Sequence, residues 1–217
     1  MAALARRHSE ILVALSGGKD SLAVMDICAK SFPKVQAFFK YLVPGLAVLE
    51  KQFQFAQDRY GIEVFQFPCN ATLEAQAAGI WCDSVADFKI PQGGIPLKLS
   101  FAYALEVSGC PIMATGMKDA DGLPRRQFFA NIRDGGDSLW NRVIHPLRAW
   151  SKKDVLDYLK ANNIPLPSQE GGATGGVGLN HDSLCWLHDN HPEDFAKLLK
   201  WFPYAGAAVK RREWFGV

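Results

Sequence analysis

The sequence lacks the features that mark membrane, secreted or metal-cluster proteins. Its five cysteines are widely spaced and none of them form a Cys-x-x-Cys pair, so neither a disulfide framework nor an iron–sulfur or all-cysteine zinc site is expected. No apolar run is long enough to cross a bilayer, and residues 1–10 are polar and basic rather than a signal peptide. We therefore expect a cytoplasmic protein with no membrane partner. The net charge of +2 argues neither for nor against nucleic acid, because the count shows no broad basic excess.

Short apolar runs alternate with helical patterns along most of the chain. Residues 11–15 form an uninterrupted apolar run, which is typical of a strand buried on both faces of a parallel sheet. A turn and a helical pattern follow this run, and the same order then repeats. Strand patterns cover residues 11–15, 35–41, 63–67 and 110–115, and helical patterns cover residues 22–30, 45–60, 97–107, 151–162 and 192–202.

This alternation predicts an α/β fold with an open, mainly parallel, five-stranded sheet flanked by helices, similar to a Rossmann fold. We assign residues 1–165 to this domain. Residues 166–217 form a short C-terminal extension, in which a glycine-rich loop over residues 170–180 precedes a helix. Because parallel sheets bind ligands beyond the carboxyl ends of their strands, the polar turns after Leu15 and Thr115 are the expected place for a site.

The turn after the first strand has the sequence Ser-Gly-Gly-Lys-Asp-Ser at residues 16–21. Its two glycines let the backbone bend tightly, so that its N–H groups and those of the following helix converge on one point. Such a point binds anions, and Lys19 adds a positive charge that suits phosphate oxygens. Asp20 would repel a phosphate, so we expect it either to bind Mg²⁺ or to cap the helix. The turn is neither a Walker A loop, because Asp20 follows the lysine, nor a Gly-x-Gly-x-x-Gly dinucleotide fingerprint.

This turn resembles the Ser-Gly-Gly-x-Asp-Ser signature of the PP-loop superfamily of adenine-nucleotide enzymes, and the match is complete. In that superfamily the loop holds the pyrophosphate end of ATP while the α-phosphate is attacked. The resemblance therefore implies an enzyme that binds an adenine nucleotide. The loop residues that it implies as nucleotide ligands are Ser16, Gly17, Gly18, Lys19, Asp20 and Ser21.

Three further features are similar to the branch of this superfamily that contains the phosphoadenosine phosphosulfate (PAPS) reductases. The variable residue of the loop signature is a lysine, Lys19. Residues 115–126 resemble the Gly-x-Arg…Glu-Ser-x-Arg segment of that branch. Residues 145–155 resemble its Pro-Leu…Trp…Asp-Val segment, which leads into a helix and then a proline turn. The resemblance extends over roughly residues 10–190.

The first of these segments adds four candidate ligands. Arg125 and Arg126 suit bidentate contacts to phosphate or sulfate on a loop beside the glycine turn. Lys118 would help in the same way, and Gly116 ends the strand before it. Tyr41, at the end of the second strand, stands where related folds contact the adenine, so it either covers the base or packs in the core.

The stretch Leu-Cys-Trp-Leu-His at residues 184–188 resembles the Glu-Cys-Gly-Leu-His motif of thioredoxin-dependent PAPS reductases. In those enzymes the cysteine thiolate attacks the sulfonate sulfur, so the resemblance implies Cys185 as the nucleophile, with His188 lowering the pKa of its thiol. The glutamate and the glycine of the motif are replaced here by Leu184 and Trp186. These departures leave a second interpretation, in which Cys185 is a buried structural residue.

We therefore expect an enzyme similar to the PAPS reductases that binds ATP with Mg²⁺, without an iron–sulfur cluster, and breaks the bond between the α- and β-phosphates. Lys19, Arg125 and Arg126 would balance the developing charge, and the acceptor is unknown. The alternatives are PAPS reduction through Cys185 with a thioredoxin-type donor, a non-catalytic nucleotide-binding module, and sulfur transfer to a nucleobase. The aromatic C-terminal tail either packs on the domain or forms a homodimer contact.

Overall fold

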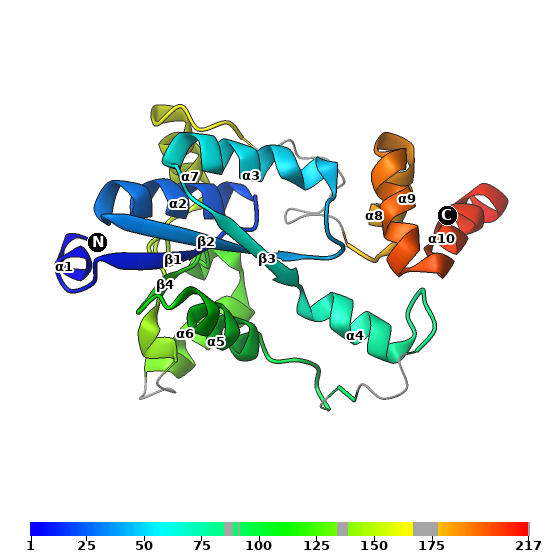
Figure 1. The fold of residues 1–217 in the computed structure, drawn as a ribbon, viewed down its shortest axis with the longest axis horizontal. Helices are drawn as coiled ribbons and strands as arrows, with labels where there is room; N and C mark the ends of the chain where they lie inside the picture. The colour runs from blue at the N-terminus through cyan, green and yellow to red at the C-terminus, as the bar shows by residue number, and fades with distance from the viewer. Residues whose placement is uncertain (85–88, 91, 134–138, 167–177, 217) are drawn as a thin grey trace. The chain divides into compact units, whose positions relative to one another are not determined.

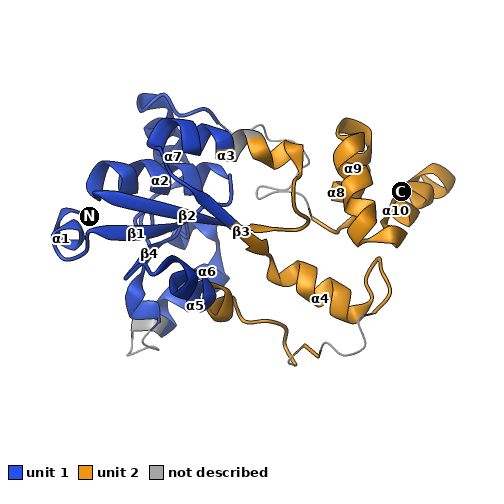
Figure 2. Ribbon diagram, in the orientation of Figure 1, with its two compact units in different colours: residues 1–39, 54–65, 101–167 blue, residues 40–53, 66–100, 168–217 orange. Residues whose placement is uncertain are grey.

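The computed structural model describes residues 1–84, 89–90, 92–133, 139–166 and 178–216. By compactness the chain divides into two units, which are coloured separately in Figure 2. The first unit consists of Met1–Phe39, Gln54–Phe65 and Phe101–Pro167, and the second of Lys40–Phe53, Gln66–Ser100 and Ser168–Val217. Each unit combines separate stretches of the chain, whereas the domain boundary expected at residue 165 is a single point; that boundary stays a prediction.

The strands form one five-stranded sheet with the order β3–β2–β1–β4–β5 (Figure 1). Strand β1 pairs in parallel with β2 and with β4, and β4 pairs in parallel with β5. Leu12 on β1 lies opposite Gln36 on β2 and Met113 on β4. The bounds are β1 (Glu10–Ala14), β2 (Lys34–Tyr41), β3 (Val64–Pro68), β4 (Met113–Ala114) and β5 (Val143–Ile144). The expected α/β fold with a parallel five-stranded sheet is confirmed.

Strand β1 occupies the middle of the sheet because it is apolar on both faces. Ile11, Leu12 and Val13 are each 0% exposed, as expected for a strand that helices cover on both sides. In Figure 1, α2, α3 and α7 lie on one face of the sheet, and α5 and α6 lie on the other. These helices are α2 (Lys19–Ser31), α3 (Ala47–Tyr60), α5 (Leu97–Ser108), α6 (Leu123–Arg133) and α7 (Lys152–Ala161), and a short helix α1 (Ala2–Ala5) precedes β1.

A buried carboxylate links three of these helices. Asp26 of α2 is 1% exposed and accepts hydrogen bonds from Lys30 Nζ (2.6 Å), Tyr158 Oη of α7 (2.7 Å) and Tyr60 Oη of α3 (2.9 Å). Burial acts to raise the pKa of this carboxyl, but the three hydrogen bonds together hold the pKa below its usual value. The ionised carboxylate therefore fixes the position of α2, and with it the loop that leads into α2.

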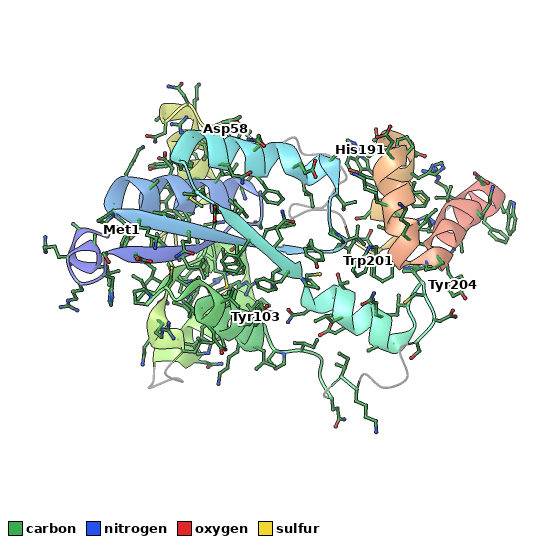
Figure 3. The ribbon with its side chains drawn as sticks, in the orientation of Figure 1. Met1, Asp58, Tyr103, His191, Trp201 and Tyr204 are labelled. Atoms are coloured by element: carbon green, nitrogen blue, oxygen red, sulfur yellow. The ribbon has the colours of Figure 1, made fainter. Side chains whose placement is uncertain are left out.

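The second unit contains the C-terminal helices. Its elements include α4 (Asn70–Ala78), α8 (His181–Asn190), α9 (Pro192–Trp201), a 3₁₀ turn (Pro203–Ala205) and α10 (Gly206–Phe215). Asp194 of α9 accepts hydrogen bonds from the backbone N–H groups of Ala47 and Val48, both at 2.9 Å, so it caps the start of α3. Tyr204, labelled in Figure 3, donates its hydroxyl to Asp83 at 2.8 Å.

The prediction that Arg125 and Arg126 lie on a loop is wrong, because both belong to helix α6. Residues Asp119–Asp121 form a 3₁₀ turn and α6 begins at Leu123. Pro124 stands in the first turn of α6, where its missing N–H costs no helical hydrogen bond. A second 3₁₀ turn, Trp140–Arg142, precedes β5. The glycine-rich loop expected over residues 170–180 lies mostly outside the described residues.

Within the described part of the chain, no helix combines the length and the apolar composition that crossing a membrane requires.

Candidate functional site

The loop after β1 leads directly into α2. Gly17 has a φ of 75°, a left-handed conformation that glycine adopts without strain. Ser21 Oγ donates to the carbonyl oxygen of Gly18 at 2.8 Å, and Ser16 Oγ donates to Ser21 Oγ at 3.2 Å, so the two hydroxyls close the turn. Among the described residues no side chain caps α2 at Gly18. The first N–H groups of this helix are therefore available to an anion.

The turn after β4 lies against this loop. A Cβ atom on Gly116 would come within 3.0 Å of Asp20 Cβ, 3.1 Å of the Asp20 backbone carbon and 3.2 Å of the Ser21 nitrogen. These distances are tighter than most contacts of a Cβ atom, so a side chain at position 116 would have to displace the neighbouring turn by a few tenths of an ångström. The chain leaves β1 toward β2 and returns on the other side of β1 as β4. The two turns thus lie at the topological switch point, where parallel sheets bind ligands.

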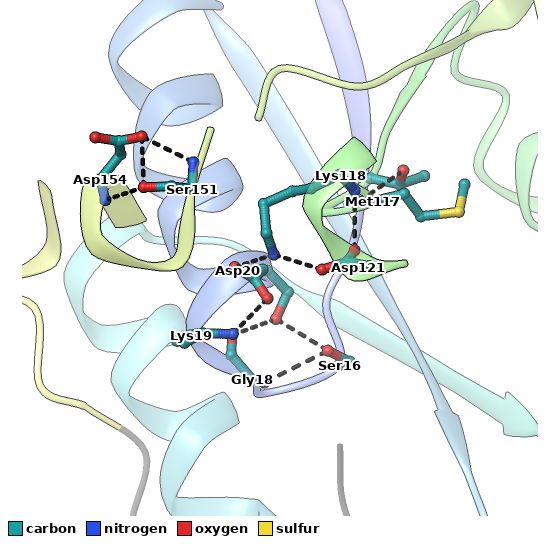
Figure 4. Close-up of polar contacts among 11 residues, drawn as sticks. Ser16, Gly18, Lys19, Asp20, Met117, Lys118, Asp121, Ser151 and Asp154 are labelled. Carbon is teal, nitrogen blue, oxygen red and sulfur yellow. Dashed lines mark hydrogen bonds and ion pairs between the residues drawn. The ribbon is translucent and has the colours of Figure 1, made fainter. Parts of the chain in front are cut away.

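Four charged side chains join the two turns (Figure 4). Lys19 Nζ lies 2.7 Å from Asp20 Oδ2, and Lys118 Nζ lies 2.7 Å from Asp20 Oδ1. Lys118 Nζ also lies 3.0 Å from Asp121 Oδ1. Lys118 is buried, whereas the side chains of Lys19 and Asp20 are 21% and 24% exposed. Lys19 is therefore accessible to an anion at the surface, while the Lys118 ammonium is enclosed by carboxylates.

The two arginines predicted to contact phosphate or sulfate lie in the first turn of α6. Arg125 Nη1 donates to Met117 Sδ at 3.1 Å, which holds the guanidinium beside the turn after β4. Arg126 is exposed. Both arginines belong to the same compact unit as the glycine loop. Arg125 also contacts Met117, in the turn after β4 that lies against this loop.

Arg148 is a further candidate that the sequence patterns did not single out. Its Nε donates to Asp119 Oδ2 at 3.2 Å, and its guanidinium carbon lies 4.4 Å from the centre of the Phe129 ring. Within the described residues its two terminal nitrogens have no hydrogen-bond partner. A guanidinium that is held through Nε and stacked on a ring presents both terminal nitrogens to an oxyanion. Its one sequence signal was its place in the segment of residues 145–155 that resembles the PAPS reductase branch.

His145 joins the ends of β4 and β5. Its Nδ1 lies 2.7 Å from Thr115 Oγ1, and its ring packs edge-on against Phe129 at 4.8 Å between ring centres. Burial, together with the positive charges of Arg148 and Arg125, lowers the pKa of His145 to about 4. The imidazole is therefore neutral at pH 7. Its Nε2 atom is buried and has no hydrogen-bond partner in the described part of the chain.

Tyr41 ends strand β2 and belongs to the second unit. Its carbonyl oxygen accepts a hydrogen bond from the backbone N–H of Cys69 at 2.8 Å. The hydroxyl of Thr72 donates to the neighbouring carbonyl of Leu42 at 2.7 Å. These bonds fix the backbone of Tyr41, and the expected role of its side chain at the adenine stays a prediction.

Cys185 lies in α8 of the second unit and is 4% exposed. Its Sγ lies 3.8 Å from His181 Nε2 and donates to the carbonyl oxygen of Ala208 at 3.7 Å. His188, the histidine expected to act on the thiol, instead has its Nδ1 2.8 Å from Asp189 Oδ1. Burial raises the pKa of the Cys185 thiol. A buried thiol with a raised pKa is a weak nucleophile, so this environment favours the structural interpretation of Cys185.

No protein-family model matches the chain, and no curated protein matches it. Two solved structures are similar to it. The U34-tRNA thiolase NcsA from Methanococcus maripaludis, solved with its [4Fe-4S] cluster, is 14% identical, with a TM-score of 0.49 over 92% of this chain and 72% of that one. The PAPS reductase from Candida auris, in a phosphate complex, is 15% identical, with a TM-score of 0.45 over 73% of this chain and 75% of that one. At 14% and 15% identity, these two similarities assign no reaction to this chain.

From the cysteine spacing we expected no iron–sulfur cluster, and that inference is wrong. The thiolase similar to this chain carries a [4Fe-4S] cluster. The absence of a Cys-x-x-Cys pair does not exclude a cluster, because cysteines that are distant in sequence can meet in space. Among the described residues, no group of three or more His, Cys, Asp or Glu side chains is arranged to hold a metal ion.

Proposed function

We propose that the protein is an enzyme that binds the phosphate chain of ATP at the loop of residues 16–21 and breaks the bond between the α- and β-phosphates. The observation that carries this proposal is the contact of Gly116 with Asp20 and Ser21, which joins the turns after β1 and β4 at the switch point of the sheet. The N-terminus of α2, which no described side chain caps, and the partly exposed Lys19 both belong to this loop. A helix N-terminus beside a lysine is suited to bind an extended anionic chain.

The arrangement of charges also supports this chemistry. Attack on the α-phosphorus forms a new bond from an acceptor oxygen and breaks the bond to the α–β bridging oxygen, which leaves with both electrons as pyrophosphate. The departing pyrophosphate gains negative charge, and Lys19 is the cation on the loop that would balance it. Arg125, Arg126 and Arg148 would stabilise the remaining oxygens of the α-phosphate or the acceptor.

The test is product analysis of ATP turned over in H₂¹⁸O with MgCl₂ present. Attack of water on the α-phosphorus places one ¹⁸O atom in AMP and none in pyrophosphate, and mass spectrometry separates these products. We expect labelled AMP from the wild-type protein and from Cys185→Ser, and a loss of at least about 100-fold in Lys19→Ala. Production of ADP and phosphate, or equal activity in Lys19→Ala, would contradict the proposal.

The same samples test the alternative reductase activity. PAPS with thioredoxin would yield sulfite and adenosine bisphosphate, and that reaction requires the Cys185 thiolate. If the wild-type protein produces sulfite and Cys185→Ser does not, the function is PAPS reduction and not ATP cleavage. Tight nucleotide binding with no product from ATP or from PAPS would instead leave a binding module, or an enzyme that still lacks its acceptor.

A further inference from the structure

Asp20 places a negative charge inside a loop that otherwise suits anions. It is the second residue of α2, directly beside the N–H groups and the lysine to which we assign the phosphate chain. Uncompensated, its carboxylate would repel every phosphate group that approached the loop. The function proposed above therefore requires some group to cancel this charge without occupying the site.

Lys118 is the side chain placed to do this. Its Nζ lies 2.7 Å from Asp20 Oδ1 and 3.0 Å from Asp121 Oδ1, and its side chain is 3% exposed. Neither Lys118 Nζ nor Asp20 Oδ1 makes a hydrogen bond of ordinary geometry to any described residue. The two groups are therefore held together by the attraction of their opposite charges. The backbone N–H of Lys118 donates to Asp121 Oδ2 at 2.9 Å, which fixes the residue at its own turn.

Lys19 and Lys118 share one carboxylate but differ in freedom. Lys19 contacts Asp20 Oδ2 and keeps 21% of its side chain exposed. Because Lys118 holds the other oxygen, Lys19 can turn from Asp20 to a phosphate without leaving the carboxylate unpaired. When Lys19 contacts a phosphate, the Asp20 carboxylate thus keeps Lys118 as its partner.

We propose that Lys118 is a positioning residue that acts through Asp20: it offsets the charge of this carboxylate, and so releases Lys19 to a phosphate, without itself touching the nucleotide. The inference rests on the proposed function, because it presupposes that the loop receives a phosphate chain. It assigns Lys118 a role different from that of a direct phosphate ligand.

The experiment measures ATP affinity by calorimetry in four proteins: wild type, Lys118→Met, Asp20→Asn and the double variant. Lys118→Met keeps the volume of the side chain and removes its charge, so we expect ATP affinity to fall by about tenfold or more. Asp20→Asn removes the repulsion, so it should bind ATP at least as tightly as the wild type. In the double variant position 20 no longer carries a repelling charge, and affinity should return to within about threefold of Asp20→Asn.

The matched control is the surface ion pair of Lys153 and Asp157 in α7, whose Nζ and Oδ2 atoms lie 2.6 Å apart. Lys153→Met, Asp157→Asn and their double variant change charge by the same amounts away from the loop, so their ATP affinities should equal that of the wild type. Thermal unfolding of all variants separates a loss of binding from a loss of fold.

Each outcome decides the matter. Absence of ATP binding by the wild-type protein would refute the proposed function before any variant is compared. With a wild type that binds, a Lys118→Met defect that Asp20→Asn does not rescue would mean direct phosphate contact or a purely structural role, and would overturn the inference. If Lys118→Met fails to fold, Asp20→Asn alone decides, because weaker binding in that variant contradicts the role assigned to Lys118.

Discussion

Gly116 and Asp20 approach each other so closely that a methyl group on Gly116 would stand 3.1 Å from the Asp20 backbone carbon. The two residues come from different turns, one after β4 and the other after β1, and their contact brings these turns together. A methyl group at position 116 would be in tighter contact than most Cβ atoms in proteins. The glycine at this position therefore favours the close approach of the two turns.

Gly116→Ala should push the two turns apart by a few tenths of an ångström. We expect a loss of about 1–3 kcal/mol in the free energy of unfolding, as for other over-packed positions, and a loss of about tenfold in ATP affinity. Urea unfolding and calorimetry measure the two effects. Gly206→Ala is the matched control, because its Cβ would meet only Leu199 Cδ2 at 4.0 Å. Equal ATP affinity in wild type and Gly116→Ala would show that the contact does not shape the site.

Arg148→Ala should weaken ATP binding by about tenfold, since it removes a guanidinium whose two terminal nitrogens bind no described residue and can hold an oxyanion. Arg148→Lys should not restore affinity fully, because an ammonium cannot bind with two parallel hydrogen bonds. Arg142→Ala is the control: Arg142 donates to the carbonyl oxygens of Pro111 and Cys110, both at 2.8 Å. The Arg142→Ala variant should lose stability and keep its ATP affinity. Unchanged ATP affinity in Arg148→Ala would show that Arg148 does not belong to the site.

His145 should make stability depend on pH in a defined direction. Its pKa of about 4 in the folded protein lies below the ordinary value of 6.5, so the unfolded chain takes up the proton more readily. The unfolding free energy should therefore fall as pH decreases from 6.5 to about 4, by about 3 kcal/mol from this group, and change no further below that. Urea unfolding at a series of pH values measures this slope, and His145→Gln should flatten it. An NMR titration that places the His145 pKa near 6.5 would contradict the prediction.

Alkylation of the native protein should distinguish buried from accessible thiols. Cys185, Cys110 and Cys28 are buried, and burial raises the pKa of each thiol, that of Cys28 to about 12. Cys69 is only half-buried. Iodoacetamide at pH 8 should therefore modify Cys69 before the other three, as peptide mass spectrometry would show. Preferential modification of Cys185 would instead support its role as the reductase nucleophile.

The sequence predicted most of the sheet and the loop because both depend on local patterns. The apolar run at residues 11–15 gave the buried central strand, and Ser151 with Asp154 gave the start of α7, where Asp154 N–H donates to Ser151 Oγ at 3.2 Å. The signature of residues 16–21 predicted the turn between β1 and α2, which is where we propose that the phosphate chain binds.

The partners of those residues were not predictable, because they depend on contacts between distant segments. Nothing in the local sequence pairs Asp20 with Lys118, or Cys185 with His181 rather than His188. The helix α6 was also missed, since Pro124 and two arginines resemble a polar loop until their place after a 3₁₀ turn is known. Spatial pairing of this kind follows from the fold and not from spacing along the chain.

The central claim is that the phosphate chain of ATP lies on the loop of residues 16–21 and the turn at Gly116. The most direct measurement is a ¹⁵N–¹H amide spectrum of the labelled protein titrated with ATP and, separately, with adenosine. We predict that ATP shifts the amides of Gly17, Gly18 and Gly116 strongly and saturably, and that adenosine leaves them nearly unchanged. Saturable ATP binding that leaves these three amides unmoved would contradict the account.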